Sequence, residues 1–555
     1  TTTGRPIYNN TTAPPPTFQT AIAAQTQATK NNSWWNLLKP YFKEYCNISS
    51  IHCFHYFTDN KLKYYEKAIW FLIMIATSVC CTIVYFDLAE LYYTQRIQTT
   101  VADSVHPIFV VPFPSVGICL RNRIDWTRLH NQAAKRFLPP NVDNETLHTF
   151  YRFFESLNDV KFYYFSRFSS LFEPSAKVNL SLIDGINVLE VLKYLTFPCS
   201  QVFGTICLWR LKSYNCCELF TLERTELGFC YVFNSAVSSK SKEKAKINPF
   251  YPYHNSYSGE GTGLDVEVIL NGNKNKPRSR TVNGIYVMIK HPEQWHADVK
   301  FINYNTFTKL SLTSQLTETD DRIRHITPVD RGCLFDDEDT HFLYRKIPGL
   351  VYWRGNCRTR CHQEYVLKYC KCNLNILFPE DKSDNFTSCK PSDFKCIYEH
   401  ANIFSRETHL FESKYIDDVD NESMTCSCLN SCKQLLYHAF YSSFPLEGVD
   451  ASDPIKMVHL DIHFQAAYLL KYRTAMRYTF VELLANFGGI IGLFLGASLL
   501  SAIELVYYFT LGLYIRLHKK FALKYRKKSS NSLKRPVKPK MIKISSIEPS
   551  GLYKY

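Results

Sequence analysis

The sequence lacks the short motifs that mark common enzymes. It contains no H-E-x-x-H zinc-protease motif and no G-x-S-x-G hydrolase motif. The glycine-rich run at 259–263 is not set between a strand and a helix, as a dinucleotide site requires. No internal repeat is evident. We therefore expect no enzyme activity, no cofactor and no bound metal.

Little of the net charge of +15 lies in the middle of the chain. The segment 516–555 holds 13 lysines and arginines against one acid, Glu548. Nucleic-acid-binding proteins carry basic residues on a folded face, so we expect no nucleic-acid partner. A basic tail directly after an apolar run is typical of the cytoplasmic side of a membrane protein, where it also meets membrane lipid.

Long apolar runs are few, but two occur. Residues 68–86 carry no charge over 19 positions, about the length that spans a bilayer as a helix. Basic residues precede this run and acids follow it, which places the N-terminus in the cytoplasm. The second run, 483–515, would measure about 50 Å as one helix against a membrane core of about 30 Å. It must tilt, break or extend beyond the membrane.

These runs predict a two-span plasma-membrane protein with both termini in the cytoplasm. The first 60 residues contain no apolar run of the signal-peptide type. The predicted segments are a cytoplasmic region at 1–67 (disordered at 1–33, a pre-span segment at 42–60), a first span at 68–88, an extracellular domain at 89–478, a second span and pore at 479–515, and a basic cytoplasmic tail at 516–555.

Sixteen of the 20 cysteines lie between the two runs, which favours disulfides because thiols outside the cell are oxidised. Zinc binding is the alternative for such clusters. The mirrored spacings C-x3-C-x8-C-x-C and C-x-C-x3-C suit a ladder, although spacing alone does not fix connectivity. Its rungs would be Cys333–Cys432, Cys357–Cys428 and Cys361–Cys426. Sequons for N-glycosylation lie both inside and outside this region. Those inside it are Asn144, Asn179, Asn385 and Asn421.

Alternating, β-branched runs predict strands in the outer region. They lie at 113–120, 229–234, 264–270, 284–289 and 457–464. Between residues 331 and 442 the pattern changes to cysteine-rich, short helical and turn segments. The predicted fold is α+β, with a sheet-rich body and a disulfide-braced helical lobe.

Residues 487–508 are apolar but carry four glycines and Glu504, which a simple anchor does not need. On a helical wheel the small residues form two faces, about 115° apart at 100° per residue. One face holds Ala485, Gly489, Gly492 and Gly496, and the other holds Ala497, Ser501 and Glu504. If both faces line one pore, the helix must break near 496–498, where freed carbonyls would meet a cation. Plain GxxxG packing of helices is the alternative.

Three motifs, together with the two spans and the cysteine lobe, resemble the degenerin/epithelial sodium channel family. FPSVGIC (113–119) looks like the family's post-span strand, and GFCYVFNS (228–235) looks like its GxCYxFNS strand. GLFLGAS (492–498) with Glu504 is similar to its pore signature. The resemblance covers about residues 42–515. It is closest to the arthropod pickpocket branch in the runs YCNISSIHCFHYF (45–57), NRIDW (122–126) and RGC (331–333).

The resemblance implies a sodium-selective, amiloride-sensitive cation channel, a homotrimer or heterotrimer gated by an unknown extracellular ligand or mechanical stimulus, with sodium as the permeant ion. It implies a hand-like domain with a palm and ball, a finger at about 127–198 and a cysteine-rich helical thumb at about 333–437. The implied sites are the selectivity filter Gly496, Ala497 and Ser498, the gating position Ala485, the blocker position Gly492, the inner-pore acid Glu504 and the re-entrant pair His52 and Cys53. The implied disulfides are the ladder with Cys119–Cys230, Cys207–Cys216, Cys370–Cys396 and Cys372–Cys389, while Cys199 and Cys217 could pair with each other.

The pair His52-Cys53 departs from the family, which has His-Gly there. Glycine allows a tight turn that cysteine cannot copy freely, so the re-entrant geometry and the open probability are in question. Two other functions stay open. This departure keeps a non-conducting receptor or accessory subunit possible, and an ATP-gated two-span channel shares the plan but not the Gly-Ala-Ser and C-x-C motifs.

Overall fold

The structure is a computed structural model, and it describes residues 34–277, 284–380, 387–408, 423–448 and 453–532. The chain divides into two compact units, which we describe separately. The terminal unit combines Thr1–Arg96 with Arg477–Tyr555, and the central unit is Ile97–Met476. The disorder predicted for 1–33 lies outside the described residues.

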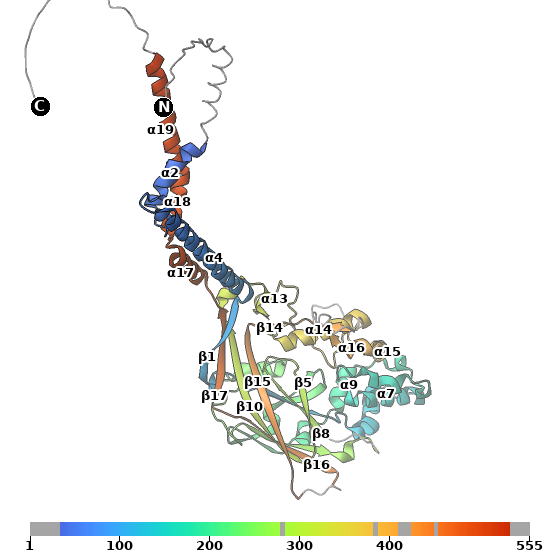
Figure 1. The fold of residues 1–555 in the computed structure, drawn as a ribbon. Coiled ribbons are helices and arrows are strands. Elements are labelled where there is room, and N and C mark those ends of the chain that lie inside the picture. Colours follow the sequence, from blue (N-terminus) through green and yellow to red (C-terminus); the bar gives the residue numbers. More distant parts are fainter. Residues whose placement is uncertain (1–33, 278–283, 381–386, 409–422, 449–452, 533–555) are drawn as a thin grey trace, which may run out of the picture. The chain divides into compact units, whose positions relative to one another are not determined.

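The terminal unit is helical, with its elements drawn in blue and red-brown in Figure 1. α4 packs along α17, where the rings of Tyr85 and Phe487 stack with centroids 4.9 Å apart. The elements are α2 (Trp34–Ile48), α3 (Phe54–Thr58), α4 (Tyr64–Thr94), α17 (Phe480–Leu495), α18 (Leu499–Tyr507), a π-helical turn (Tyr508–Gly512) and α19 (Leu513–Ser532).

Two helical stretches among the described residues are long and apolar enough to cross a membrane, Tyr64–Thr94 and Leu499–Leu523. The first has 31 residues and extends at both ends beyond the predicted 68–88. α17 is also apolar but has only 16 residues. The second predicted span, 479–515, is therefore not one helix, and helical structure continues past its predicted end to Ser532.

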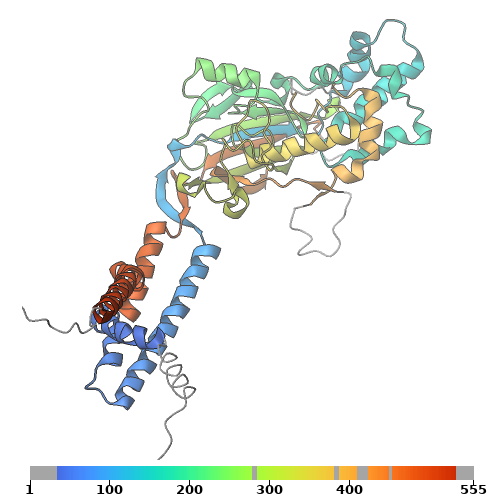
Figure 2. The ribbon, with the colours of Figure 1, turned by 90° about the horizontal axis from the view of Figure 1, so that it is seen from above.

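A large sheet runs through the central unit (Figures 1 and 2). It has eight strands. Its order is β1-β17-β10-β16-β7-β3-β4, and β15 also pairs with β10. β10 pairs antiparallel with β15 and parallel with β16 and β17. Its alternate residues Thr308, Leu310 and Leu312 are buried, as the two-residue period of a strand requires. The strands are β1 (Ile97–Pro107), β3 (Ile206–Trp209), β4 (Lys212–Asn215), β7 (Leu264–Asn271), β10 (Thr306–Thr319), β15 (Lys433–Pro445), β16 (Ile455–Phe464) and β17 (Tyr468–Met476).

A second sheet has five strands in the order β5-β6-β2-β8-β9. The two sheets share one apolar core, in which Phe113 contacts Phe464 of β16 with ring centroids 5.0 Å apart. The strands are β2 (Ser115–Leu120), β5 (Phe220–Thr225), β6 (Gly228–Phe233), β8 (Gly284–Lys290) and β9 (Val299–Asn303).

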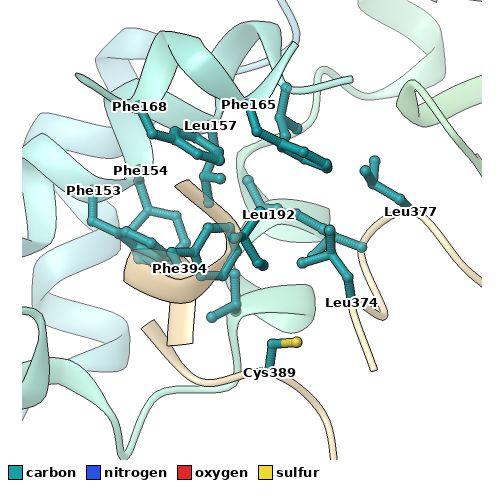
Figure 3. Packing of buried hydrophobic residues seen from close by; sticks show 14 of the residues in the cluster. Phe153, Phe154, Leu157, Phe165, Phe168, Leu192, Leu374, Leu377, Cys389 and Phe394 are labelled. Carbon is teal, nitrogen blue, oxygen red and sulfur yellow. The ribbon is translucent and has the colours of Figure 1, made fainter. Parts of the chain in front are cut away.

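A second core joins two groups of helices, one from residues 127–198 and one from the cysteine-rich lobe. Figure 3 shows Phe394 of the lobe among Phe153, Phe154 and Phe168 of the first group, with the Phe153 and Phe394 ring centroids 5.0 Å apart. The helices are α5 (Trp126–Arg128), α6 (Ala134–Phe137), α7 (Asn144–Ser156), α8 (Ser169–Phe172), α9 (Val188–Leu195), α14 (Arg354–Cys370), α15 (Phe394–Glu399) and α16 (Ala401–Phe404). Short elements complete the unit: α10 (Cys199–Val202), α11 (Cys216–Leu219), α12 (Ser239–Ile247), α13 (Pro328–Arg331), β11 (Cys333–Leu334), β12 (Glu407–Thr408), β13 (Met424–Thr425) and β14 (Asn430–Ser431).

Disulfides join cysteines of the central unit, so these sulfurs are not zinc ligands. Seven pairs are those that the resemblance implies, and an eighth joins Cys199 to Cys217. The other cysteines of the described chain, Cys46, Cys53, Cys80 and Cys81, are free and belong to the terminal unit. The seven pairs are Cys119–Cys230, Cys207–Cys216, Cys333–Cys432, Cys357–Cys428, Cys361–Cys426, Cys370–Cys396 and Cys372–Cys389.

The five predicted strands are present, each within two residues of its predicted bounds. The segment 331–442 differs from the prediction. It holds α14, a helix of 17 residues, and the first ten residues of β15, a strand of 13 residues. β15 is largely exposed, with Leu436, Phe440 and Phe444 on its exposed side, and all 13 of its residues pair with β10.

Candidate functional site

The second apolar run breaks at the predicted place, near residues 496–498. α17 ends at Leu495, and Gly496 takes the left-handed conformation with φ 62° and ψ 18°. Ser498 is extended, with φ −110° and ψ 174°, and α18 begins at the next residue. Residues 496–498 therefore form a non-helical link between two helices, as predicted.

Each helix end at the link is capped, but two carbonyl oxygens of the link accept no hydrogen bond from the described residues. The Gly496 amide donates to the Gly492 carbonyl at 3.0 Å and closes α17. Ser498 and Ser501 form a reciprocal pair at the start of α18, each backbone amide donating to the other residue's hydroxyl oxygen. Among the described residues, no donor reaches the carbonyl oxygens of Gly496 and Ala497. Uncommitted carbonyls at membrane depth can coordinate a cation.

The turn before the first span lies against this link. The amide of His52 donates to the carbonyl of Leu495 at 2.9 Å, which satisfies an oxygen that the break leaves without a helical partner. The hydroxyls of Ser50 and Ser501 lie 2.6 Å apart. The His52 ring fills the space beside Gly496, because a Cβ on Gly496 would lie 2.3 Å from ring atoms. Two features therefore require glycine at position 496: its positive φ and the close approach of the His52 ring.

Residues 41–52 follow the second apolar run in the opposite direction. The Tyr41 hydroxyl donates to the Tyr508 carbonyl at 2.5 Å, at the π-helical turn. The Tyr45 ring lies 5.4 Å from that of Tyr508 and 5.3 Å from that of Phe509. Further along this segment, Ser50 contacts Ser501 and His52 contacts Leu495. Residues 41–52 therefore run antiparallel to the second apolar run, from Tyr508 to Leu495.

Cys53 adopts the conformation that normally selects glycine. Its φ is 69° and its ψ is −13°, in the left-handed region, at the residue before α3. The tight turn, which we expected glycine to favour and cysteine to disturb, therefore forms with cysteine at position 53. A side chain in this region costs about 1–2 kcal/mol, so the turn holds a local strain.

The other predicted pore residues are exposed in the isolated chain. Ala485, Gly492 and the side chain of Glu504 face outward, and no described side chain pairs with Glu504. A Cβ on Gly488 or Gly489 would meet nothing within 4 Å. Ser501, which the wheel placed with Ala497 and Glu504, is instead buried beneath Ser50.

Two of the predicted glycosylation sites can be placed. Asn144 is the first residue of α7 and Asn179 precedes a short helical turn, and both side chains are exposed. Asn385 and Asn421 lie outside the described residues.

Sequence patterns did not reveal a buried charged cluster in the central unit. His362 of α14 lies 3.0 Å from a Glu226 oxygen and 3.3 Å from a Glu407 oxygen. Tyr163 and Arg358 also donate to Glu407, each at 2.8 Å. Burial would lower the pKa of His362, but the Glu226 carboxylate raises it overall. Burial would raise the pKa of Glu226, but His362 lowers it to about 2. These residues are far apart in sequence, so no local motif marks them.

A profile of the amiloride-sensitive sodium channel family matches residues 45–508. The chain belongs to this family. Pickpocket protein 19 of Drosophila melanogaster is 29% identical over 467 residues, which cover 83% of this chain and 88% of the relative. Sodium channel protein Nach of Drosophila ananassae is 24% identical over 492 residues, covering 85% and 87%. The bile acid-sensitive ion channel of Mus musculus is 22% identical over 495 residues, covering 86% and 88%.

Family membership gives the coarse architecture. The chain is a two-span membrane protein with a large extracellular domain, which corresponds to the disulfide-rich α+β central unit. The amiloride-sensitive sodium channel family consists of plasma-membrane ion channels and not of enzymes. The pickpocket likeness expected from the short runs agrees with the first of the relatives named above.

Proposed function

We propose that the protein is a pore-forming subunit of a sodium-selective, amiloride-sensitive cation channel. The observation that supports this most is the link at 496–498, where α17 and α18 separate and two carbonyl oxygens accept no hydrogen bond from the described residues. A simple membrane anchor would continue as one helix, because unwound backbone at membrane depth is tolerated only in protein or beside water.

In this proposal Gly496, Ala497 and Ser498 form the selectivity filter, and His52 with Cys53 holds the link from the cytoplasmic side. Ala485 is the gating position and Gly492 the blocker position, both on the exposed face of α17. Glu504 concentrates cations at the inner pore, since its carboxylate is exposed beyond the link.

The subunit assembles as a homotrimer or heterotrimer in the plasma membrane, with both termini in the cytoplasm. The exposed glycines of α17 support assembly, because small residues on a membrane helix favour close packing against another helix. An extracellular ligand or a mechanical stimulus gates the channel. The mouse relative named for its sensitivity to bile acid supports ligand gating.

The decisive experiment is Ala485→Val, expressed alone and with related subunits. A bulky side chain at the gating position should hold the pore open and give a standing sodium current that amiloride blocks. Current is recorded while surface biotinylation measures delivery of the variant to the membrane. A variant that reaches the surface and carries no such current in any combination contradicts the pore assignment.

A non-conducting accessory subunit is the second candidate, and Cys53 favours it because a side chain at positive φ strains the turn that contacts the link. The accessory role predicts that the chain alters the current of a related subunit without carrying one itself. An ATP-gated channel is a weaker alternative, which an ATP dose–response would separate.

A further inference from the structure

A cluster of cations lies beside the end of β2 in the central unit. Arg121 and Arg123 follow this strand, and Lys161 and Arg167 come from the segment after α7. Burial lowers the pKa of Lys161, the Asp159 carboxylate raises it, and the three arginines lower it further, so the four cations act on one another. Asp159 itself pairs with Arg167. The four cations of this cluster therefore share the carboxylate of Asp159.

An aromatic ring brings two of these cations together. The Lys161 ammonium lies 3.9 Å from the centroid of the Tyr164 ring, and the Arg167 guanidinium lies 5.9 Å from the same centroid. The face of an aromatic ring attracts a cation, but the cation keeps its net charge. Tyr164 therefore holds two positive charges close together and neutralises neither.

Two further rings extend the cluster to Arg121. The centroid of the Tyr286 ring of β8 lies 5.2 Å from the Lys161 ammonium and 5.3 Å from the centroid of the Phe301 ring of β9. The Arg121 guanidinium lies 5.5 Å from the Phe301 centroid. One chain of ring contacts thus joins Arg167, Lys161 and Arg121, in that order.

The side chains of these three residues are accessible to a ligand. The Arg167 side chain is 49% exposed, and Arg121 and Lys161 are half-buried. Within the part of the chain that the structure describes, no carboxylate pairs with Arg121 or Lys161, and neither side chain donates a hydrogen bond. Arg123 differs because it is buried and donates to two backbone carbonyls. It adds charge to the cluster but offers no contact.

The positive charge of the cluster is a local feature of the central unit. Most of the net charge of +15 lies in residues 516–555, which belong to the terminal unit. Like charges held close together repel one another, and a bound anion with several charged groups would offset this repulsion. The central unit corresponds to the extracellular domain of the family. Outside the cell, sulfated glycans carry sulfate groups at repeated intervals, and sulfates accept charge-assisted hydrogen bonds from arginine and lysine.

We propose that Arg121, Lys161 and Arg167 form a binding surface for a sulfated glycan chain, with successive sulfate groups at successive cations. Basic patches bind heparin-like chains through charge, so this binding should weaken as the salt concentration rises. The predicted pore and filter residues belong to the terminal unit. Glycan binding is therefore separate from conduction and can be measured without current.

Binding of a fluorescent heparin hexasaccharide to intact cells tests this surface. The cells express the full chain and lack sulfated glycans of their own, and surface biotinylation corrects for the amount of protein. The desulfated, N-acetylated hexasaccharide should bind about tenfold more weakly or less, because it lacks the sulfates that pair with the cations. The double variant Arg121→Gln with Lys161→Gln should weaken binding of the sulfated form about tenfold or more. Glutamine keeps part of each apolar stem, so this variant should fold.

Two further variants control for fold and for charge elsewhere. Lys161→Arg keeps the positive charge and should keep the binding. Lys193→Gln is the matched control, because Lys193 is an exposed cation of α9 and contacts none of the three rings. The double variant leaves residues 516–555 unchanged, so its loss of binding would exclude that basic segment as the site.

Three results would each overturn the inference: no binding of the sulfated hexasaccharide, equal binding of its desulfated form, or a double variant that binds as the unmodified chain does. Polyglutamate of equal charge is added as a competitor. If it displaces the probe more readily than unlabelled heparin does, the surface fits an acidic protein and the glycan proposal fails.

Discussion

The amide of His52 donates a hydrogen bond of 2.9 Å to the carbonyl of Leu495, the last residue of α17. The ring of the same histidine lies where a side chain on Gly496 would have to go. One residue of the pre-span turn thus completes the helix end and fixes the shape of the link that follows it.

Gly496→Ala should disable the link. A Cβ would lie 2.3 Å from the His52 ring, and alanine at positive φ costs about 1–2 kcal/mol in addition. We expect a large loss of sodium current, or a loss of sodium over potassium preference measured from reversal potentials. Gly185→Ala is the control, because Gly185 is an exposed residue of the central unit and a Cβ there meets nothing within 4 Å of the described chain. Equal currents in both variants would show that the link does not shape the filter.

Cys53→Gly should relax the turn. Glycine accepts a φ of 69° without the steric cost of about 1–2 kcal/mol that a side chain brings. We expect a changed open probability in single-channel records. Cys53→Ala separates strain from thiol chemistry, since alanine keeps the strain and removes the sulfur. If alanine and glycine change gating alike, the thiol and not the backbone is responsible.

Tyr41 and Gly512 should behave as a coupled pair. A Cβ on Gly512 would lie 2.6 Å from the Tyr41 hydroxyl oxygen, which also donates to the Tyr508 carbonyl. Gly512→Ala should therefore be harmful with tyrosine at 41 and milder in a Tyr41→Phe background. A double-mutant cycle on the open–closed equilibrium constant from single-channel records should give a coupling free energy of about 0.5–3 kcal/mol, as for residues in contact. Strictly additive effects would place the two residues apart.

The charged cluster around His362 should make the central unit lose stability at alkaline pH. The pKa of His362 is raised in the fold, so its contribution is fully present below its unfolded pKa of about 6.5 and is lost as the pH rises through the folded value. The pKa values of Glu226 and Glu407 are lowered to about 2, so their contribution to stability is fully present above about pH 4.5 and is lost progressively as the pH falls toward 2.

Thermal unfolding of the full chain between pH 5 and 9 measures this effect. His362→Gln should lower stability at pH 6 by about 3–5 kcal/mol, as breaking a buried ion pair does. It should also flatten the alkaline slope. An unchanged slope in the variant would assign the pH dependence to other groups.

The sequence predicted what depends on local patterns. The strands β2, β6, β7, β8 and β16 follow from alternating apolar residues, and the break follows from two mismatched wheel faces. β10 was missed although Leu310, Leu312 and Leu316 alternate in it, because serine and threonine dilute the pattern. Side-chain contacts between distant segments could not be predicted from local patterns. Neither the Ser50–Ser501 contact nor the His362 cluster has a signal in local spacing. The mirrored cysteine spacings suggested the three ladder disulfides, and the family resemblance supplied four further pairs.

The antiparallel path of residues 41–52 has a consequence for biosynthesis. Ser50 and Ser501 are separated by 451 positions in the chain, with the whole central unit between them. During synthesis the pre-span segment exists long before the helix that it contacts. The link at 496–498 can therefore acquire its final shape only after α17 and α18 have been made, so a chain that ends before them would contain α4 and the disulfide-bonded central unit but not this link.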